Sequence, residues 1–429
     1  MTGTVAIIFG TIVVFATAYF LIKQFETRTV LMAAGFLMAI AAFAPLKAFN
    51  AFSTAMVTGG LIQNICSTLG FAMVLQLTGC DKHLIYFMAK GLAKARPVII
   101  PGAAIATFCI NIALPSAAGC AAAVGVIMIP LLISQGISPM MAASAVMMGT
   151  FGSVLSPGLM HNPMVAKLAN IDVVEVIRGH ALATVASIVI GAVSLVVVAK
   201  IFKDDQGTPG SESGGLDMNF SVNPLLALLP IIPVTILLVF SMDAVKAALP
   251  WAKTFNVPHA MLLGAFLCML CTKTNPQQAV KNFYDGMGKA YADVLGIIIA
   301  AGIFVSGMGA LGLIDAFITL LKTSGSGMVN LAATYGPFLL GVISGTGDAA
   351  AVAFNQSVTP HAADFGLKIS QMGSLATLGG ALGRTMSPLA GAAIICAGIA
   401  KVNPFELSKR IAPGMLLASI ASMILLAYM

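Results

Sequence analysis

The sequence has 429 residues, of which 59% are hydrophobic and only 9% are charged, whereas about a quarter of the residues in an ordinary soluble domain carry a charge. A soluble fold could not cover that much apolar surface, so these proportions exclude a soluble enzyme and a secreted disulfide scaffold. The formal net charge of +7 is typical of short basic loops between membrane spans and does not indicate nucleic-acid binding. Apolar stretches of bilayer-spanning length recur along the chain and predict an all-α polytopic membrane protein.

The first predicted element is a membrane span from Val5 to Ile22, which is expected to be retained because no basic segment precedes it. Further along the first half, residues 1–202, the apolar runs are interrupted around Pro115 and around Pro157. Residues 203–223 are polar and rich in Gly and Ser, which is typical of a flexible aqueous linker. The second half, residues 224–429, is interrupted around Thr346 and Pro388.

The two halves match each other at a constant spacing of 231 residues. The pattern G-x-x-G-x-x-x-S-P begins at Gly149 and again at Gly380, and other positions follow the same register without gaps. Such a match favours an ancestral duplication. A broken helix exposed to hydrocarbon would cost several kcal/mol for each unsatisfied backbone group, so paired interruptions predict a binding site near the membrane midplane. The alternative is that the glycines only allow helices to pack closely.

Two charged residues are predicted at membrane depth, where an ionisable group is by default a functional hypothesis. Arg384 has a planar guanidinium suited to a carboxylate; alternatively it pairs with Asp348 or binds backbone carbonyls. Asp348 could coordinate Na⁺ or take up a proton, with Ser344 and Thr346 completing the site. Alternatively, Asp348 caps a helix that begins at Ala349.

Hydroxyl and amide side chains beside the interruptions complete the predicted site. The hydroxyls are expected where half-helices begin, because backbone amides there can bind an anion. His161 could also be a loop residue at the membrane interface. The predicted substrate-binding residues are Ser116, Ser156, His161, Asn162, Ser344, Thr346, Asn355, Arg384 and Ser387.

The other charged residues are expected at the ends of spans. Asp285, Lys289 and Asp293 are four residues apart and could form an ion-pair ladder at a wet helix entrance. A second group is expected to be solvated or to contact lipid headgroups. It comprises Lys401, Glu406, Lys409 and Arg410. The sequence contains no nucleotide-binding loop or catalytic motif, so no cofactor is expected and any active transport must use a gradient.

Four motifs of the second half follow one another in order: Gly286–Ala292, Ala300–Phe304, Leu382–Pro388 and Ala397–Glu406. They resemble the DcuC-type anaerobic C4-dicarboxylate transporters, and LGRT-x-SP is the most specific of them. The resemblance implies an inner-membrane carrier for succinate, fumarate or malate, driven by protons or Na⁺ or working by exchange. It also implies the wider ion-transporter superfamily, with homodimers, inverted repeats, re-entrant hairpins and elevator-type motion.

The break at residues 345–350 departs from the family pattern, in which Ser replaces Thr346, Asn replaces Asp348 and Pro replaces Ala350. An added negative charge beside a dianion would disfavour the substrate unless a cation or proton joins it. This departure predicts cation coupling.

These observations together predict a multi-pass secondary transporter of small organic anions, above all C4-dicarboxylates, in the bacterial inner membrane. It would work by symport, antiport or exchange. A sulfonate or an amino acid is an alternative substrate. The alternative functions are a cation/proton antiporter without an organic substrate and an intramembrane enzyme, for which the sequence offers no convincing nucleophile and base.

Overall fold

The computed structural model describes residues 3–23, 25–93, 98–205, 220–324 and 326–428, and all regular secondary structure among these residues is helical, with no strand. Eight of the described helical segments are long and apolar enough to cross a membrane. This confirms the predicted polytopic all-α class. The segments are Thr4–Ile22, Gly59–Thr78, Ala117–Ser134, Val173–Phe202, Pro276–Ala310, Gly327–Ser344, Ile369–Ala400 and Pro404–Ala427.

The helices of the first half begin with the predicted first span and end at the linker, whose residues 206–219 lie outside the described chain. They are α1 (Thr4–Ile22), α2 (Thr27–Ala41), α3 (Pro45–Met56), α4 (Gly59–Thr78), α5 (Cys80–Ala93), α6 (Ile99–Ala113), α7 (Ala117–Ser134), α8 (Pro139–Met148), the 3₁₀ helix η2 (Gly149–Leu155), α9 (His161–Ala169) and α10 (Val173–Phe202).

The second half contains the following elements. They are α11 (Pro224–Leu228), α12 (Ile232–Phe240), α13 (Asp243–Ala248), η3 (Pro250–Thr254), α14 (Val257–Thr272), α15 (Pro276–Ala290), the π-helical turn η4 (Tyr291–Leu295), α16 (Gly296–Ala310), α17 (Leu313–Ser324), α18 (Ser326–Ser344), α19 (Gly347–Ser357), η5 (Thr359–Phe365), α20 (Ile369–Met386), α21 (Gly391–Ala400) and α22 (Pro404–Ala427).

Helix boundaries recur at the 231-residue spacing. Shifted by 231 residues, the bounds of α2, α3, α5, α6, α9 and α10 fall on or within a few residues of those of α14, α15, α17, α18, α21 and α22, apart from the unequal ends of α10 and α22. Local geometry recurs as well: Asn170 and Lys401 end α9 and α21 in the left-handed conformation, both with φ of 54°. Asp172 and Asn403 then cap α10 and α22 by accepting a hydrogen bond from a backbone amide.

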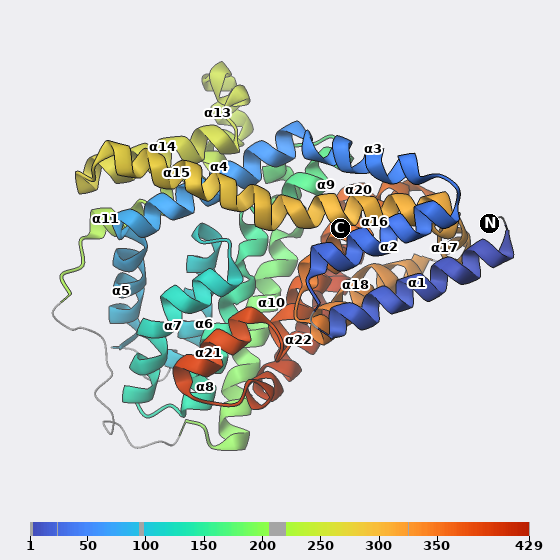
Figure 1. The fold of residues 1–429 in the computed structure, drawn as a ribbon. Helices are drawn as coiled ribbons and strands as arrows, with labels where there is room; N and C mark the ends of the chain where they lie inside the picture. Colours follow the sequence, from blue (N-terminus) through green and yellow to red (C-terminus); the bar gives the residue numbers. More distant parts are fainter. Residues whose placement is uncertain (1–2, 24, 94–97, 206–219, 325, 429) are drawn as a thin grey trace.

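Helices of one half pack against helices of the other half in a reciprocal pattern. Helix α4 packs against α14 and α15, whereas α16 packs against α2 and α3, and α10 packs against α22. In Figure 1, α2, α4 and α14–α16 form a long upper layer, and α5–α8, α10, α21 and α22 lie below it. The two broken regions therefore meet beneath this upper layer.

The glycines of the repeated motif allow helices to pack closely. A Cβ added at Gly152 would lie 2.1 Å from the carbonyl oxygen of Phe108, and one at Gly383 would lie 2.1 Å from that of Phe338. In both halves, a glycine thus allows the close approach of two helices: η2 to α6 in the first half and α20 to α18 in the second. These glycines have the packing role that the sequence left as an alternative.

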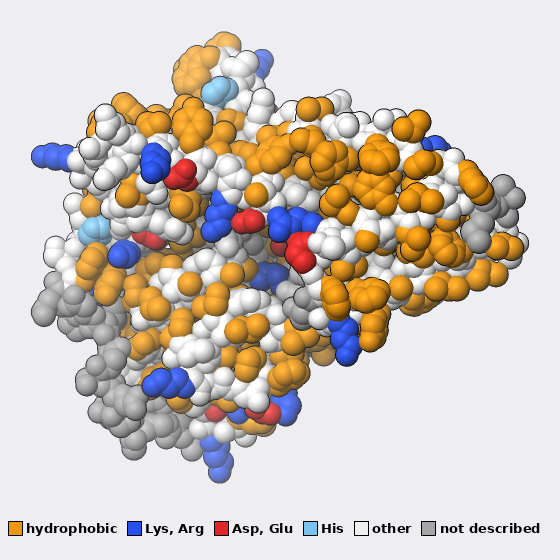
Figure 2. Space-filling view, in the orientation of Figure 1, with side chains coloured by type: hydrophobic (Ala, Val, Ile, Leu, Met, Phe, Trp, Pro, Cys, Tyr) orange, Lys and Arg blue, Asp and Glu red, His pale blue; other side chains and the backbone are white. Residues whose placement is uncertain are grey.

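The outer faces are apolar, as contact with lipid requires. On α10, exposed side chains recur every three or four residues, so they form one stripe along the helix. They are Leu182, Val185, Val189, Val193 and Val197. Figure 2 shows broad hydrophobic surface on the right of the molecule, where α1 and α2 lie in Figure 1, and charged side chains gathered near the middle.

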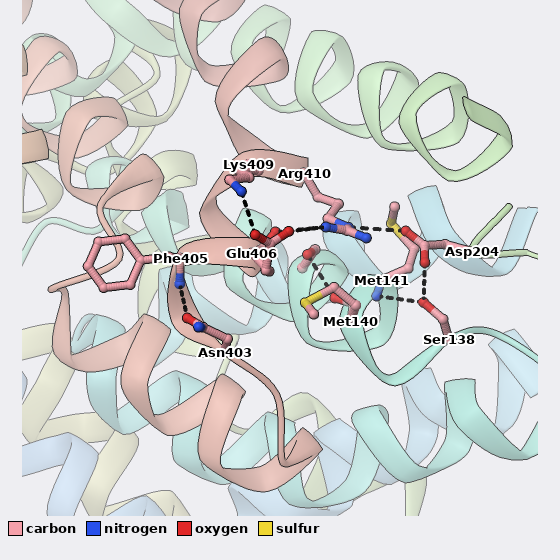
Figure 3. A network of polar contacts seen from close by, with 10 residues as sticks. Ser138, Met140, Met141, Asp204, Asn403, Phe405, Glu406, Lys409 and Arg410 are labelled. Carbon is pink, nitrogen blue, oxygen red and sulfur yellow. Dashed lines mark hydrogen bonds and ion pairs between the residues drawn. The ribbon is translucent and has the colours of Figure 1, made fainter. Parts of the chain in front are cut away.

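A buried ion-pair network joins the end of α10 to the start of α22 (Figure 3). Arg410 Nε lies 3.2 Å from Asp204 Oδ2, Arg410 Nη1 lies 3.0 Å from Glu406 Oε2, and the Ser138 hydroxyl donates to Asp204 at 2.8 Å. The guanidinium also lies over the Phe202 ring. The expectation that Arg410 is solvated or contacts headgroups is wrong, because only 9% of it is exposed and it pairs with Asp204, which lies at the start of the predicted linker.

Candidate functional site

A cavity of about 320 Å³ lies where the two broken regions meet. Its lining comes from α4, α15 and η4 on one side and from both breaks on the other. Figure 2 shows a hollow with blue and red side chains near the centre of the molecule. The polar side chains that line the cavity are Ser116, Ser153, His161, Lys289, Asp293, Thr346, Asp348 and Arg384.

The first break separates α6 from α7. Ser116 caps α7, since its hydroxyl accepts a hydrogen bond from the Gly119 amide at 3.1 Å. Asn111 holds this break in place: its amide nitrogen donates to the Leu114 carbonyl at 2.8 Å, and its amide oxygen accepts from the Ser153 amide at 2.7 Å. The sequence analysis missed Asn111. A polar amide one turn before a proline break, inside an apolar run, was the available signal.

The second break separates α18 from α19. Gly345 turns the chain with φ of 73°, a left-handed conformation that favours glycine. The Ser344 hydroxyl donates to the Leu340 carbonyl at 2.6 Å, so it is engaged within its own helix and does not line the cavity. Thr346 precedes α19 and lines the cavity. Helices α7 and α19 therefore both begin at the cavity, and their N-terminal amides favour a negative charge there.

Arg384 reaches the cavity from α20 and is only 9% exposed. Its Nη2 donates to the Thr150 carbonyl at 2.9 Å, which joins α20 to η2 of the other half. In the described part of the chain this is the only hydrogen bond of the guanidinium, and no carboxylate lies within 4.0 Å of the guanidinium nitrogens. One alternative for Arg384, a bond to a backbone carbonyl, is thus present, while other guanidinium donors stay available to a ligand.

Asp348 contacts His161 across the two halves: Oδ1 lies 3.1 Å from His161 Nε2. His161 is 3% exposed, and its Nδ1 is buried with no hydrogen-bond partner among the described residues, whereas 38% of the Asp348 side chain is exposed. Asp348 lies in the first turn of α19, which begins at Gly347 after Thr346. The expectation that Asp348 caps a helix beginning at Ala349 is therefore wrong.

Lys289 and Asp293 bring two further charges to the cavity from the upper layer. The predicted ladder with Asp285 is not formed, because no ion pair joins these three residues anywhere in the described chain. Asp293 lies on the π-helical turn η4 and faces Arg28 of α2 at 4.0 Å. Asp285 and Lys289 both precede this turn on α15, so the wider π-helical turn displaces only Asp293 from the face that the four-residue spacing predicts.

The other predicted site residues do not line the cavity. Ser156 and Ser387 follow the ends of η2 and α20, so the expectation that they begin half-helices is wrong. Asn162 donates to the Val154 and Ser156 carbonyls at 2.8 Å each. Asn355 accepts from Thr359 at 2.8 Å. Asn162 therefore holds the backbone around the first break, whereas Asn355 bonds a side chain beyond the second. No cluster of three or more His, Cys, Asp or Glu suited to a metal occurs among the described residues.

The sequence matches the family model for the DcuC C4-dicarboxylate anaerobic carriers over residues 5–429. The chain belongs to the DcuC family. One relative, an uncharacterized transporter of Haemophilus influenzae, is 42% identical over 62% of this chain and 97% of its own length. The probable anaerobic C4-dicarboxylate transporter DcuC of Vibrio cholerae is 25% identical over 97% of this chain and 96% of its own. The anaerobic C4-dicarboxylate transporter DcuC of Escherichia coli is 23% identical over 96% of this chain and 94% of its own length.

The DcuC family model confirms the resemblance stated from the sequence motifs. The family is one of transporters, not enzymes. With eight apolar helices of spanning length in the described part of the chain, this DcuC-family member is a multi-pass protein of the bacterial inner membrane.

Proposed function

We propose that this DcuC-family protein is a secondary active carrier that binds one C4-dicarboxylate in the cavity between the two breaks. The observation that carries the proposal is the position of Arg384, a nearly buried cation with donors to spare, beside the N-termini of α7 and α19. Ser116 and Thr346 add hydroxyls at the same cavity. A guanidinium and two helix N-termini together favour a carboxylate.

The charges of the cavity support cation coupling. Lys289 and Arg384 bring two positive charges, and Asp293 and Asp348 bring two negative charges. When Arg28, which faces Asp293, is counted as well, a dicarboxylate would leave one uncompensated negative charge in a region of low dielectric, which is unfavourable. A proton or Na⁺ that enters with the substrate would offset part of this cost.

We place the coupling site at Asp348. Its carboxylate contacts His161 and has the Thr346 hydroxyl beside it on the same cavity wall. A proton taken up by the pair would give His161 a full positive charge beside the substrate. Na⁺ would instead bind the Asp348 oxygens with hydroxyl and carbonyl oxygens of the break. Proton coupling and Na⁺ coupling are distinguished by whether succinate uptake responds to a proton gradient or to a Na⁺ gradient.

The matching helix bounds and the exchanged packing of α4 and α16 support two structural repeats. We propose that the repeats are inverted, that α7 and α19 belong to hairpins that re-enter the membrane, and that the carrier works as a homodimer with elevator-type motion. Crosslinking between cysteines introduced on α4 and α20 would test the motion. Crosslinks that form in only one state of the transport cycle support the elevator-type motion. The same crosslinks in the outward-facing and inward-facing states oppose it.

Uptake of labelled succinate into proteoliposomes tests the proposed function. We expect saturable uptake that responds to an inward Na⁺ gradient, to an inward proton gradient or to internal succinate. Asp348→Asn should remove the response to the cation gradient. Asp315→Asn, which changes an exposed carboxylate in the first turn of α17, is the matched control. Cation exchange without succinate binding would favour the antiporter alternative and overturn this proposal.

A further inference from the structure

We infer that Lys289 binds the second carboxylate of the substrate and so sets the preference for dicarboxylates over monocarboxylates. The inference rests on the proposed function and extends it to the part of the cavity that α15 lines. Lys289 belongs to α15, whereas Arg384 belongs to α20, and both line the same cavity. A four-carbon chain with a carboxylate at each end can contact two cations that different helices bring to one cavity.

The partners of the surrounding charges support this role. The described residues give Lys289 no ion-pair partner, although two carboxylates, Asp285 and Asp293, lie one helical turn away on either side. Asp293 faces Arg28 at 4.0 Å, and Asp348 contacts His161 at 3.1 Å. Both carboxylates of the cavity therefore have their own cationic or imidazole partner, which leaves the Lys289 ammonium available to a ligand.

The π-helical turn η4 provides the geometric reason. Arg28 Nη1 donates to the Ala292 carbonyl within this turn at 2.9 Å and also faces Asp293. Partial burial would raise the pKa of Glu26, but hydrogen bonds from Arg28 and Thr29 lower it to about 2, so Glu26 stays ionised and holds Arg28 in place. Arg28 thus draws Asp293 away from the Lys289 ammonium. A π-helical turn within a long helix is frequently found at functional sites.

A comparison of two ligands of equal length tests the inference. Succinate and butyrate both have four carbons, but butyrate lacks the second carboxylate. In Lys289→Gln, we expect the Kd of succinate to rise about 10-fold while that of butyrate changes less than 2-fold, because an exposed lysine contributes one screened charge-assisted contact. Lys289→Arg should keep succinate within about 3-fold of the parent protein. Lys281→Gln, an exposed lysine on the same helix outside the cavity, should change neither ligand.

A second variant has the opposite expected sign. Asp293→Asn removes a negative charge from the cavity, so it should tighten succinate about 3-fold and leave butyrate nearly unchanged. Equal succinate affinity in Lys289→Gln and the parent protein would overturn the inference. The proposed function stands even if the Lys289 inference fails, provided that the parent protein binds succinate and Arg384→Gln lowers the affinity for both succinate and butyrate. If the parent protein binds neither ligand, the proposed function itself fails.

Discussion

Replacement of Arg384 by glutamine tests the carboxylate site directly. Glutamine keeps a donor and much of the length of the side chain but removes the charge. The guanidinium already gives one donor to the Thr150 carbonyl, so about two others can reach a carboxylate. A hydrogen bond to a charged group contributes about 1.5–3 kcal/mol, so loss of the charged contact predicts a Kd for succinate about 10- to 150-fold higher.

The assay is calorimetric titration of succinate into the purified protein in nanodiscs. Arg178→Gln is the matched control, because Arg178 is exposed at the start of α10 and bonds the Ser241 hydroxyl far from the cavity lining. Arg384→Lys should fall between the parent protein and Arg384→Gln, since it keeps the charge but loses the planar fork. A folded Arg384→Gln variant with the parent's succinate affinity would refute the reasoning.

Three further predictions concern stability and are checked by thermal or denaturant unfolding of the purified protein. Gly383→Ala should lower the free energy of unfolding by about 1–3 kcal/mol, because its Cβ would meet the Phe338 carbonyl; Gly288→Ala, whose Cβ would meet open space, is the control. Asn162→Ala should lower it by about 2–4 kcal/mol, because two carbonyl oxygens lose their donor. Arg410→Met should lower it by about 2–3 kcal/mol, because a buried carboxylate loses its cation.

Each of these predictions has a result that contradicts it. Equal stability of Gly383→Ala and Gly288→Ala would mean that the α18–α20 contact is looser than described. An unchanged midpoint for Asn162→Ala would mean that water or a neighbouring residue replaces its amide. If Arg410→Met matched the parent protein, the link between α10 and α22 would contribute nothing to stability.

Local signals in the sequence were sufficient for much of the fold. The membrane spans follow from hydropathy, and the breaks near Pro115 and Thr346 follow from proline and glycine within apolar runs. The 231-residue spacing anticipated which helices would correspond, because a duplicated segment keeps its helix lengths. Arg384 and Asp348 were identified as site candidates because a charge within an apolar run is costly.

Contacts between distant segments could not be derived in this way. His161 and Asp348 are 187 positions apart, and no local pattern pairs them. The direction of the chain at Ser156 and Ser387 was also misjudged, because a Ser-Pro sequence is compatible with either the beginning or the end of a helix. Arg410 looks like a surface residue in a basic stretch, and its burial depends on Asp204, which is 206 positions away in the predicted linker.

An experimental structure with bound succinate tests the central claim most directly. The account predicts one succinate in the cavity, with one carboxylate between Arg384 and the N-termini of α7 and α19 and the other facing α15. Succinate found elsewhere, or a cavity that stays empty at saturating succinate, would contradict it.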